Sequence, residues 1–181
     1  MLIKDLLINL NQKKIFTINS QPAANCKPSS DPYVGWGPSN GFIFQRFYIE
    51  FFIDSQKLDI LIQFLKQSNT ISYQAINKNG DVVQSINQPF VTALTWGVFP
   101  NREILQPTIY DSEVFSIWKE EAFNLWNEWI KVYDDPDNEN DQTSAALLRS
   151  IQNDYYLVTI LDNDFVTSKV EQLLNDFLKS I

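Results

Sequence analysis

The chain has 181 residues, and its 44% hydrophobic and 14% aromatic content is enough to exclude a disordered chain. A formal net charge of −8 with no basic stripe excludes nucleic acid and anionic membranes as expected partners. The absence of histidine excludes Ser–His and Cys–His catalytic pairs, and the single cysteine, Cys26, excludes an intrachain disulfide and the usual Cys/His zinc site.

The first part of the sequence predicts a helix, a strand, a long loop and a second strand. Apolar residues with helical spacing indicate the helix at about residues 2–10. A β-type run follows at Ile15–Ile18. Residues 19–41 are rich in turn residues and predict one long, ordered loop. The aromatic and β-branched stretch 42–53 predicts a single strand.

A second helix and a hairpin are predicted next. Asp54 is suited to the N-cap of the helix. The predicted buried face of that helix consists of Leu58, Leu61, Ile62 and Leu65. Asn79-Gly80 predicts a hairpin between strands at 71–76 and 81–83, because a type I′ turn needs positive φ at both central residues.

The third quarter of the sequence predicts two strands and the longest helix. The strands are expected at 91–99 and 103–110. The helix is expected at 111–133, where aromatic and aliphatic residues form one wide apolar face. The acidic run 134–141 ends it.

The last part predicts a short helix at 143–151, a strand at 154–161 and a final helix with a capping box formed by Ser168 and Glu171. Short turns between consecutive strands favour antiparallel pairing. The sequence therefore predicts one α+β domain over residues 1–181, with mixed, largely antiparallel β-sheets flanked by about five helices.

Three local patterns have both a functional and a structural interpretation. Residues 35–41 are glycine-rich, but their spacing is wrong for a nucleotide loop and a strand follows them, so a structural turn is favoured. The acidic run 134–141 lacks the glycine of a calcium loop, which favours a solvated loop. Asp162 and Asp164 can form an acid/base pair, but a turn is favoured. No catalytic residue and no metal site is predicted.

The five tryptophans divide into two groups. Trp118, Trp126 and Trp129 fall on the apolar face of the predicted long helix, which favours core packing. Trp36 and Trp96 each precede a glycine near a turn, and they are the better candidates for stacking on a ligand.

A series of motifs, several of them with tryptophan or proline, carries a family resemblance. In chain order they are Thr17-Ile-Asn-Ser-Gln-Pro22, Lys27-Pro-Ser-Ser-Asp-Pro32, Val34-Gly-Trp-Gly-Pro-Ser39, Glu50-Phe-Phe52, Thr95-Trp-Gly-Val-Phe-Pro100, Arg102-Glu-Ile104, Gln106-Pro-Thr108, Trp118-Lys-Glu-Glu-Ala-Phe123 and Asp162-Asn-Asp-Phe165. In these motifs and their order the chain resembles the C-terminal, S-adenosylmethionine-binding regulatory domain of eukaryotic methylenetetrahydrofolate reductase. The resemblance covers nearly the whole chain.

The resemblance implies a non-catalytic, regulatory-type module of one-carbon metabolism that senses S-adenosylmethionine or S-adenosylhomocysteine and acts through a partner protein. The family's flavin-containing barrel has no counterpart in the chain, so we expect no enzyme activity and no covalently bound cofactor. The family domain also continues upstream of Thr17 with further ligand contacts, so the ligand site is expected to be incomplete. The alternative is a structural or interaction subunit of a larger assembly that has lost ligand binding.

The resemblance also implies a set of ligand-binding residues. The family's contacts match Thr17, Ile18, Asn19, Ser20 and Gln21, together with Thr95 and Thr108. Hydroxyl, amide and backbone groups are suited to the carboxylate and ammonium of a free amino-acid moiety.

The sequence also gives an expected location and an expected contact surface. It shows no secretory signal, its apolar runs are too short to span a bilayer, and it has one cysteine, so an intracellular, most simply cytoplasmic, protein is expected. Uncovered apolar surface for a protein partner is expected on the first helix, residues 2–10, and on the strand 42–53.

Overall fold

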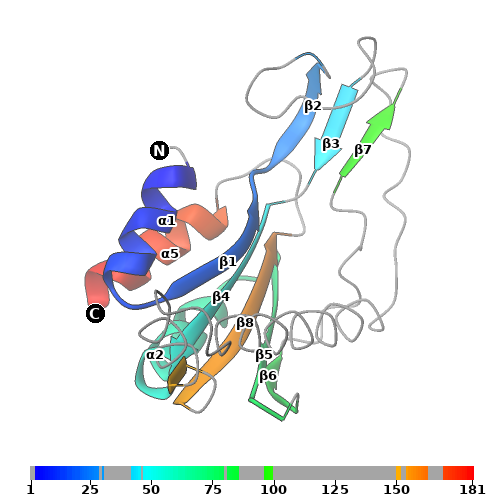
Figure 1. The fold of residues 1–181 in the computed structure, drawn as a ribbon. Helices are drawn as coiled ribbons and strands as arrows, with labels where there is room; N and C mark the ends of the chain where they lie inside the picture. The colour runs from blue at the N-terminus through cyan, green and yellow to red at the C-terminus, as the bar shows by residue number, and fades with distance from the viewer. Residues whose placement is uncertain are drawn as a thin grey trace, which may run out of the picture.

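A computed structural model describes much of the chain. The described residues are 3–28, 30, 42–45, 47–79, 81–85, 96–99, 150–151, 154–162 and 169–181. Within them, helices α1 (Ile3–Gln12), α2 (Ser55–Leu65) and α5 (Lys169–Ser180) lie on one face of a five-stranded sheet (Figure 1). Every described strand pair is antiparallel, so the predicted α+β class is confirmed.

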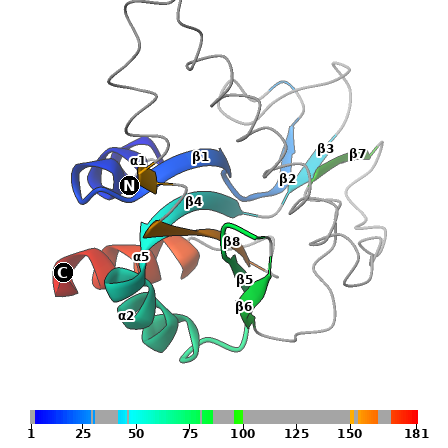
Figure 2. The same cartoon turned by 60° about the horizontal axis from the view of Figure 1, so that its bottom comes forward.

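The large sheet has the strand order β1-β4-β8-β5-β6. Its strands are β1 (Phe16–Gln21), β4 (Tyr48–Asp54), β8 (Tyr155–Asp162), β5 (Ile71–Ile76) and β6 (Val82–Ser85). Figure 2 shows the strands following one another in this order, with the three helices on the same side. Because β8 lies between β4 and β5, the centre of the sheet joins two distant parts of the chain.

A smaller sheet extends from one end of the large one (Figure 1). Its strands are β2 (Ala24–Pro28), β3 (Phe42–Gln45) and β7 (Trp96–Phe99), in the order β2-β3-β7. Two predictions are therefore wrong. The predicted loop 19–41 contains the end of β1 and all of β2, because pairing with β3 overrides a weak local preference for strand. The predicted single strand 42–53 is two strands in different sheets.

The main hydrophobic core lies between the large sheet and the helices. Alternate residues of β4, Ile49, Phe51 and Ile53, are fully buried on this side. From the helices the core takes Leu6, Leu10, Leu58, Leu61, Ile62, Leu65, Val170, Leu174, Phe177 and Leu178. The predicted apolar face of α2 is thus confirmed in full.

The second face of the large sheet also carries a buried apolar cluster. A smaller apolar cluster there consists of Phe52, Ile76, Ile151 and Leu157, with Phe16, Ile18 and Tyr155 packed against it. The rings of Phe16 and Tyr155 lie 5.7 Å apart. Phe47 and residues 49–53 are at most 7% exposed, so the predicted uncovered surface is wrong for this part of the stretch 42–53. The side chains of residues 42–46 lie outside the described part of the chain.

The predicted count of about five helices is not confirmed. The described residues form three helices of ten or more residues, and the predicted helix 111–133 and strand 103–110 lie outside them. Of the predicted short helix 143–151, residues 150–151 are described and are helical. In the described part of the chain, no helix is long and apolar enough to cross a membrane.

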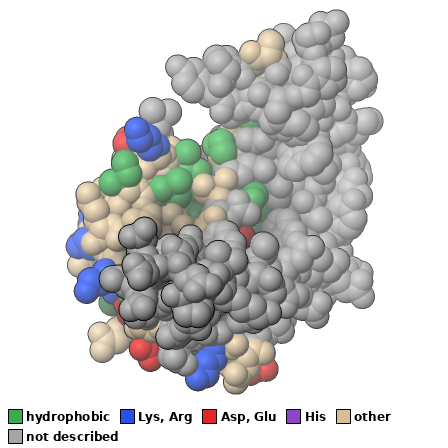
Figure 3. Space-filling view, viewed as in Figure 1, with side chains coloured by type: hydrophobic (Ala, Val, Ile, Leu, Met, Phe, Trp, Pro, Cys, Tyr) green, Lys and Arg blue, Asp and Glu red, His purple; other side chains and the backbone are tan. Residues whose placement is uncertain are grey.

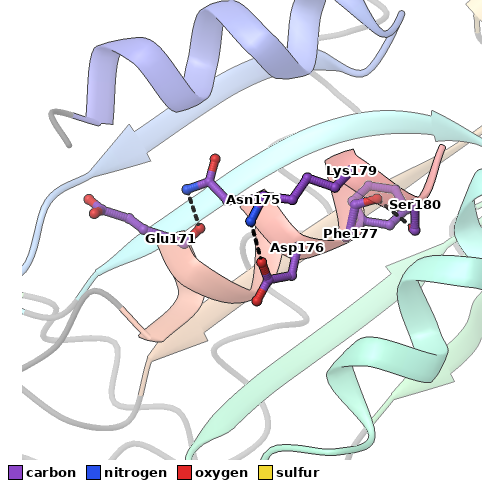
Figure 4. A network of polar contacts seen from close by, with 6 residues as sticks. All are labelled: Glu171, Asn175, Asp176, Phe177, Lys179 and Ser180. Carbon is purple, nitrogen blue, oxygen red and sulfur yellow. Dashed lines mark hydrogen bonds and ion pairs between the residues drawn. The ribbon is translucent and has the colours of Figure 1, made fainter.

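Helix α5 is held in the fold by packing rather than by its surface polar contacts (Figure 4). Asn175 Nδ2 donates to the Glu171 carbonyl at 2.7 Å, and Ser180 Oγ donates to the Phe177 carbonyl at 2.6 Å. The exposed Lys179–Asp176 ion pair, at 2.8 Å, contributes little because water screens it. Ser168 of the predicted capping box lies outside the described residues.

Asp54 caps helix α2, as predicted. Its Oδ1 accepts a hydrogen bond from the Lys57 backbone N–H at 2.9 Å, and its Oδ2 forms an ion pair with Lys57 Nζ. Burial on its own would raise the pKa of Asp54. The hydrogen bonds and charge of Lys57 outweigh burial and hold that pKa below its ordinary value.

We expect Asp54→Ala to lower the free energy of unfolding by about 1 kcal/mol at pH 7, and Asp54→Asn, which keeps a capping acceptor, to lower it less. Because the pKa is depressed in the folded state, the extra stability of the carboxylate is present above the unfolded pKa of about 4 and disappears as the pH falls through the folded pKa. Urea unfolding at pH 7 and pH 3 measures both effects. An alanine variant equally destabilised at the two pH values would contradict the pH dependence.

Candidate ligand-binding site

The structure gathers most of the predicted site residues on one strand. Thr17, Ile18, Asn19, Ser20 and Gln21 all belong to β1, which forms one edge of the five-stranded sheet and pairs with β4. Thr95 and Thr108 lie outside the described residues. The grouping of these two threonines with β1 therefore stays a prediction.

A β-bulge interrupts β1 in the middle of this group. Thr17 pairs with Phe51 and Asn19 pairs with Glu50, so Ile18 is an extra residue with no partner of its own in the register. Ile18 packs against the apolar cluster on the second face. Bulges re-aim side chains and are common beside functional sites.

The bulge places the two hydroxyl residues on the same side of β1. Thr17 pairs with Phe51 and Ser20 with Ile49, and both of these partners face the helices. Thr17 and Ser20 are half-buried. Side chains of directly paired residues point to the same face, so Thr17 and Ser20 belong to the helix side of this edge.

The turn between α1 and β1 brings the end of the helix beside the strand. Lys14 adopts a left-handed conformation, with φ of 59°, and the Ile15 N–H donates to the Leu10 carbonyl at 3.0 Å. This hydrogen-bond pattern satisfies a carbonyl at the helix C-terminus and reverses the chain. As a result, the last turn of α1 lies against the first residues of β1.

Asn11 of α1 holds Thr17 through both ends of its carboxamide. Asn11 Nδ2 donates to Thr17 Oγ1 at 2.7 Å and to the Leu7 carbonyl at 2.7 Å. The Thr17 backbone N–H donates to Asn11 Oδ1 at 3.4 Å. Because the edge of a sheet leaves backbone groups without a strand partner, Asn11 satisfies one of them at the start of β1.

An open groove of about 580 Å³ lies along α1 next to this contact. It is lined by Ile3, Lys4, Leu7, Ile8, Asn11 and Gln12. Ile8 is 44% exposed, and Figure 3 shows hydrophobic side chains gathered in the region of α1 and β1. The predicted apolar surface on the first helix is thus present, and Asn11 connects it to Thr17.

A polar row crosses the second face of the sheet. The register aligns Asn19, Glu50, Thr159, Gln74 and Ser85 across all five strands. Thr159 Oγ1 donates to Glu50 Oε1 at 3.0 Å, and these two residues are 8% and 7% exposed. A buried carboxylate is costly unless it is hydrogen-bonded, so this contact is part of what makes Glu50 tolerable there.

Over residues 1–181 the chain matches the family model described as "MTHFR, SAM-binding regulatory domain". The chain belongs to this family of methylenetetrahydrofolate reductase regulatory domains. The resemblance of its motifs to that domain is thereby confirmed.

Relatives in plants and fungi carry the same domain. The chain is 45% identical over 166 residues to "Methylenetetrahydrofolate reductase (NADH) 1" of Zea mays. This alignment covers 91% of the chain and 27% of the Zea mays protein. It is 46% identical over 164 residues to "Methylenetetrahydrofolate reductase 1" of Schizosaccharomyces pombe, and this alignment covers 91% of the chain and 26% of that protein. "Methylenetetrahydrofolate reductase 2" of Saccharomyces cerevisiae is 44% identical over 171 residues. The chain spans about a quarter of the length of these curated relatives.

The relatives correct one expectation from the sequence. We expected that the chain is not an enzyme, but the proteins it matches are named reductases, which are enzymes. The reasoning from the missing barrel applied to the matched stretch, which is 27% of the length of the Zea mays relative and 26% of the Schizosaccharomyces pombe one. The family to which this regulatory domain belongs is therefore one of enzymes.

Three residues of the site region were not predicted from the sequence. Glu50 and Thr159 are polar residues inside otherwise apolar strands, and that interruption was an available signal. Asn11 gave no signal, because a polar residue on the exposed side of a helix is ordinary. Its contact with Thr17 becomes visible only once α1 and β1 lie side by side.

The other candidates from the sequence gain no support. Asp162 is fully buried as the last residue of β8, and its N–H donates to the Phe47 carbonyl at 2.9 Å. Residues 163–168, where the predicted turn would continue, lie outside the described residues. Asp164 and Trp36 lie outside the described residues, and for Trp96 only the backbone, in β7, is described. Among the described residues, no group of three or more His, Cys, Asp or Glu side chains is placed to hold a metal ion.

Proposed function

We propose that this chain binds S-adenosylmethionine or S-adenosylhomocysteine at the edge strand β1, and that this binding regulates a reductase catalytic domain in a partner chain. The single observation that carries the proposal is the bulged edge strand, on which Thr17 and Ser20 share one side. It occurs in a chain of the family of S-adenosylmethionine-binding regulatory domains.

The chemistry of β1 supports a ligand with a free amino-acid moiety. Such a moiety carries a carboxylate that accepts hydrogen bonds and an ammonium that donates them. Half-buried hydroxyls such as those of Thr17 and Ser20 can do either. Partial burial strengthens such hydrogen bonds because competition from water is reduced.

Titration calorimetry of the 181-residue chain with each of the two ligands tests the proposal. We expect dissociation constants on the order of 10 μM or weaker, which is a binding free energy of about 7 kcal/mol or less. Thr17→Val and Ser20→Ala each remove one hydroxyl and should each weaken binding about fivefold, which is the effect of about 1 kcal/mol.

Ser85→Ala is the matched control for Ser20→Ala, because Ser85 is exposed on the opposite edge strand β6. Its affinity for both ligands should equal that of the wild type. Nanomolar binding, or unchanged binding in both Thr17→Val and Ser20→Ala, would reject β1 as the site.

The alternative function is that of a structural or interaction subunit without a ligand. The apolar groove on α1, with Ile8 44% exposed, favours it. If it holds, the chain binds neither ligand and self-associates in light scattering. A monomer that binds no hydrophobic dye would count against this alternative.

A further inference from the structure

The orientation of the Asn11 side chain is fixed by groups that bond in only one direction. The Thr17 backbone N–H can only donate, and it meets Asn11 Oδ1. The Leu7 carbonyl can only accept, and it meets Asn11 Nδ2. The carboxamide therefore cannot be reversed without losing both contacts.

The fixed carboxamide also fixes the role of the Thr17 hydroxyl. An amide N–H is always a donor, so Thr17 Oγ1 must be the acceptor in its 2.7 Å contact with Asn11 Nδ2. The hydroxyl hydrogen is not used in this contact. Within the described part of the chain, Thr17 Oγ1 makes no other hydrogen bond, and the residue is half-buried rather than covered. Its hydrogen is therefore available for an acceptor outside these contacts.

We propose that Asn11 is a positioning residue that makes the Thr17 hydroxyl a hydrogen-bond donor to the carboxylate of the ligand's amino-acid moiety. This inference rests on the proposed function, because it assigns a direction to one contact of the same site. A hydroxyl in water turns to suit a donor or an acceptor. Asn11 removes that freedom before the ligand arrives, so binding loses less entropy and favours an anionic group.

Asn11→Asp tests the direction of this hydrogen bond with almost no change in shape. One carboxylate oxygen can still accept from the Thr17 N–H, but the other has no hydrogen to give. The Thr17 hydroxyl must then donate to the new carboxylate and present lone pairs to the ligand. We expect the affinity for S-adenosylmethionine in calorimetry to fall at least about tenfold, since hydrogen bonds to charged groups are the stronger ones.

The added negative charge is controlled in two ways. Asn9→Asp makes the same substitution two residues earlier in α1, where Asn9 is exposed and does not line the groove, and should change the affinity by no more than about twofold. Asn11→Asp is also measured in the Thr17→Val background. There the hydroxyl is absent, so the loss should be several times smaller than in the wild type.

The outcomes separate the inference from the proposed function. A wild-type chain that binds neither ligand overturns the proposed function and this inference with it. If the wild-type chain binds, two results overturn the inference alone. One is that Asn11→Asp binds as tightly as the wild type. The other is that Asn11→Asp lowers the affinity by the same factor whether or not the Thr17 hydroxyl is present. Thermal unfolding checks that each variant is folded. If Asn11→Asp does not fold, Asn11→Ala replaces it, and its affinity for S-adenosylmethionine should be at least about fivefold lower than that of the wild type.

Discussion

Phe51→Ala should lower the free energy of unfolding by about 3–5 kcal/mol, which is the usual cost of removing a fully buried aromatic ring. Phe51 is 0% exposed, lies in the middle of β4 and packs in the core beneath the helices. It is also the register partner of Thr17, so the cavity would form directly beside the candidate site. Urea unfolding of the isolated chain measures the loss.

Ile8→Ala is the matched control for this large-to-small substitution. Ile8 is 44% exposed on α1, so its truncation should change the free energy of unfolding by no more than about 0.5 kcal/mol. If Phe51→Ala costs less than about 1 kcal/mol, the cluster around it is not the main core of the domain.

S-Adenosylmethionine at about one hundred times its dissociation constant should raise the free energy of unfolding by about 2.7 kcal/mol, provided that it binds the folded chain alone. The reason is mass action, since a ligand of the native state draws the equilibrium toward that state. Thermal or urea unfolding with and without the ligand measures the shift.

Thr17→Val is the variant control for this stabilisation, and adenosine is the ligand control. Thr17→Val keeps the β-branched shape that suits a strand but removes the hydroxyl, so at the same ligand concentration its stabilisation should be smaller. Adenosine lacks the amino-acid moiety and should stabilise the chain least. If S-adenosylmethionine stabilises the wild type and Thr17→Val equally, the ligand binds elsewhere.

Local patterns predicted those elements whose signals are short in range. The spacing of Leu6 and Leu10 predicted α1, and Asp54 predicted the start of α2. The hairpin was also correct, but its turn is not the predicted type I′ turn, because Asn79 does not have a positive φ and the backbone hydrogen bond joins Asn77 to Asp81. There the Asn77 side chain accepts hydrogen bonds from the backbone N–H groups of Asn79 and Asp81, each at 2.9 Å. In each of these cases the residues that decide the structure lie within a few positions of one another.

The two errors in the strands have long-range causes. The turn-rich composition of residues 19–41 hid β2, which forms because β3 provides a pairing partner. The break between β3 and β4 was hidden because apolar residues occupy both faces throughout 42–53, so alternation could not mark where the chain leaves one sheet for the other. Tertiary pairing thus overrode local preference in both places.

The candidate site was predicted only in part, and for the same reason. The motif around Thr17 indicated residues 17–21 because they are contiguous in the sequence. The bulge at Ile18 depends on the register with β4, which no local pattern encodes. Likewise, Glu50 and Thr159 are 109 residues apart in the sequence and meet only in the folded sheet.

The central claim is that S-adenosylmethionine binds at β1, beside the end of α1. Amide hydrogen exchange with and without the ligand tests it most directly, because exchange reports local opening segment by segment. We predict slower exchange in β1, residues 16–21, and in the last turn of α1, residues 9–12, with little change in β6, residues 82–85, at the opposite edge of the sheet. Unchanged exchange in β1 at a saturating ligand concentration, or slowing confined to other segments, would contradict the account.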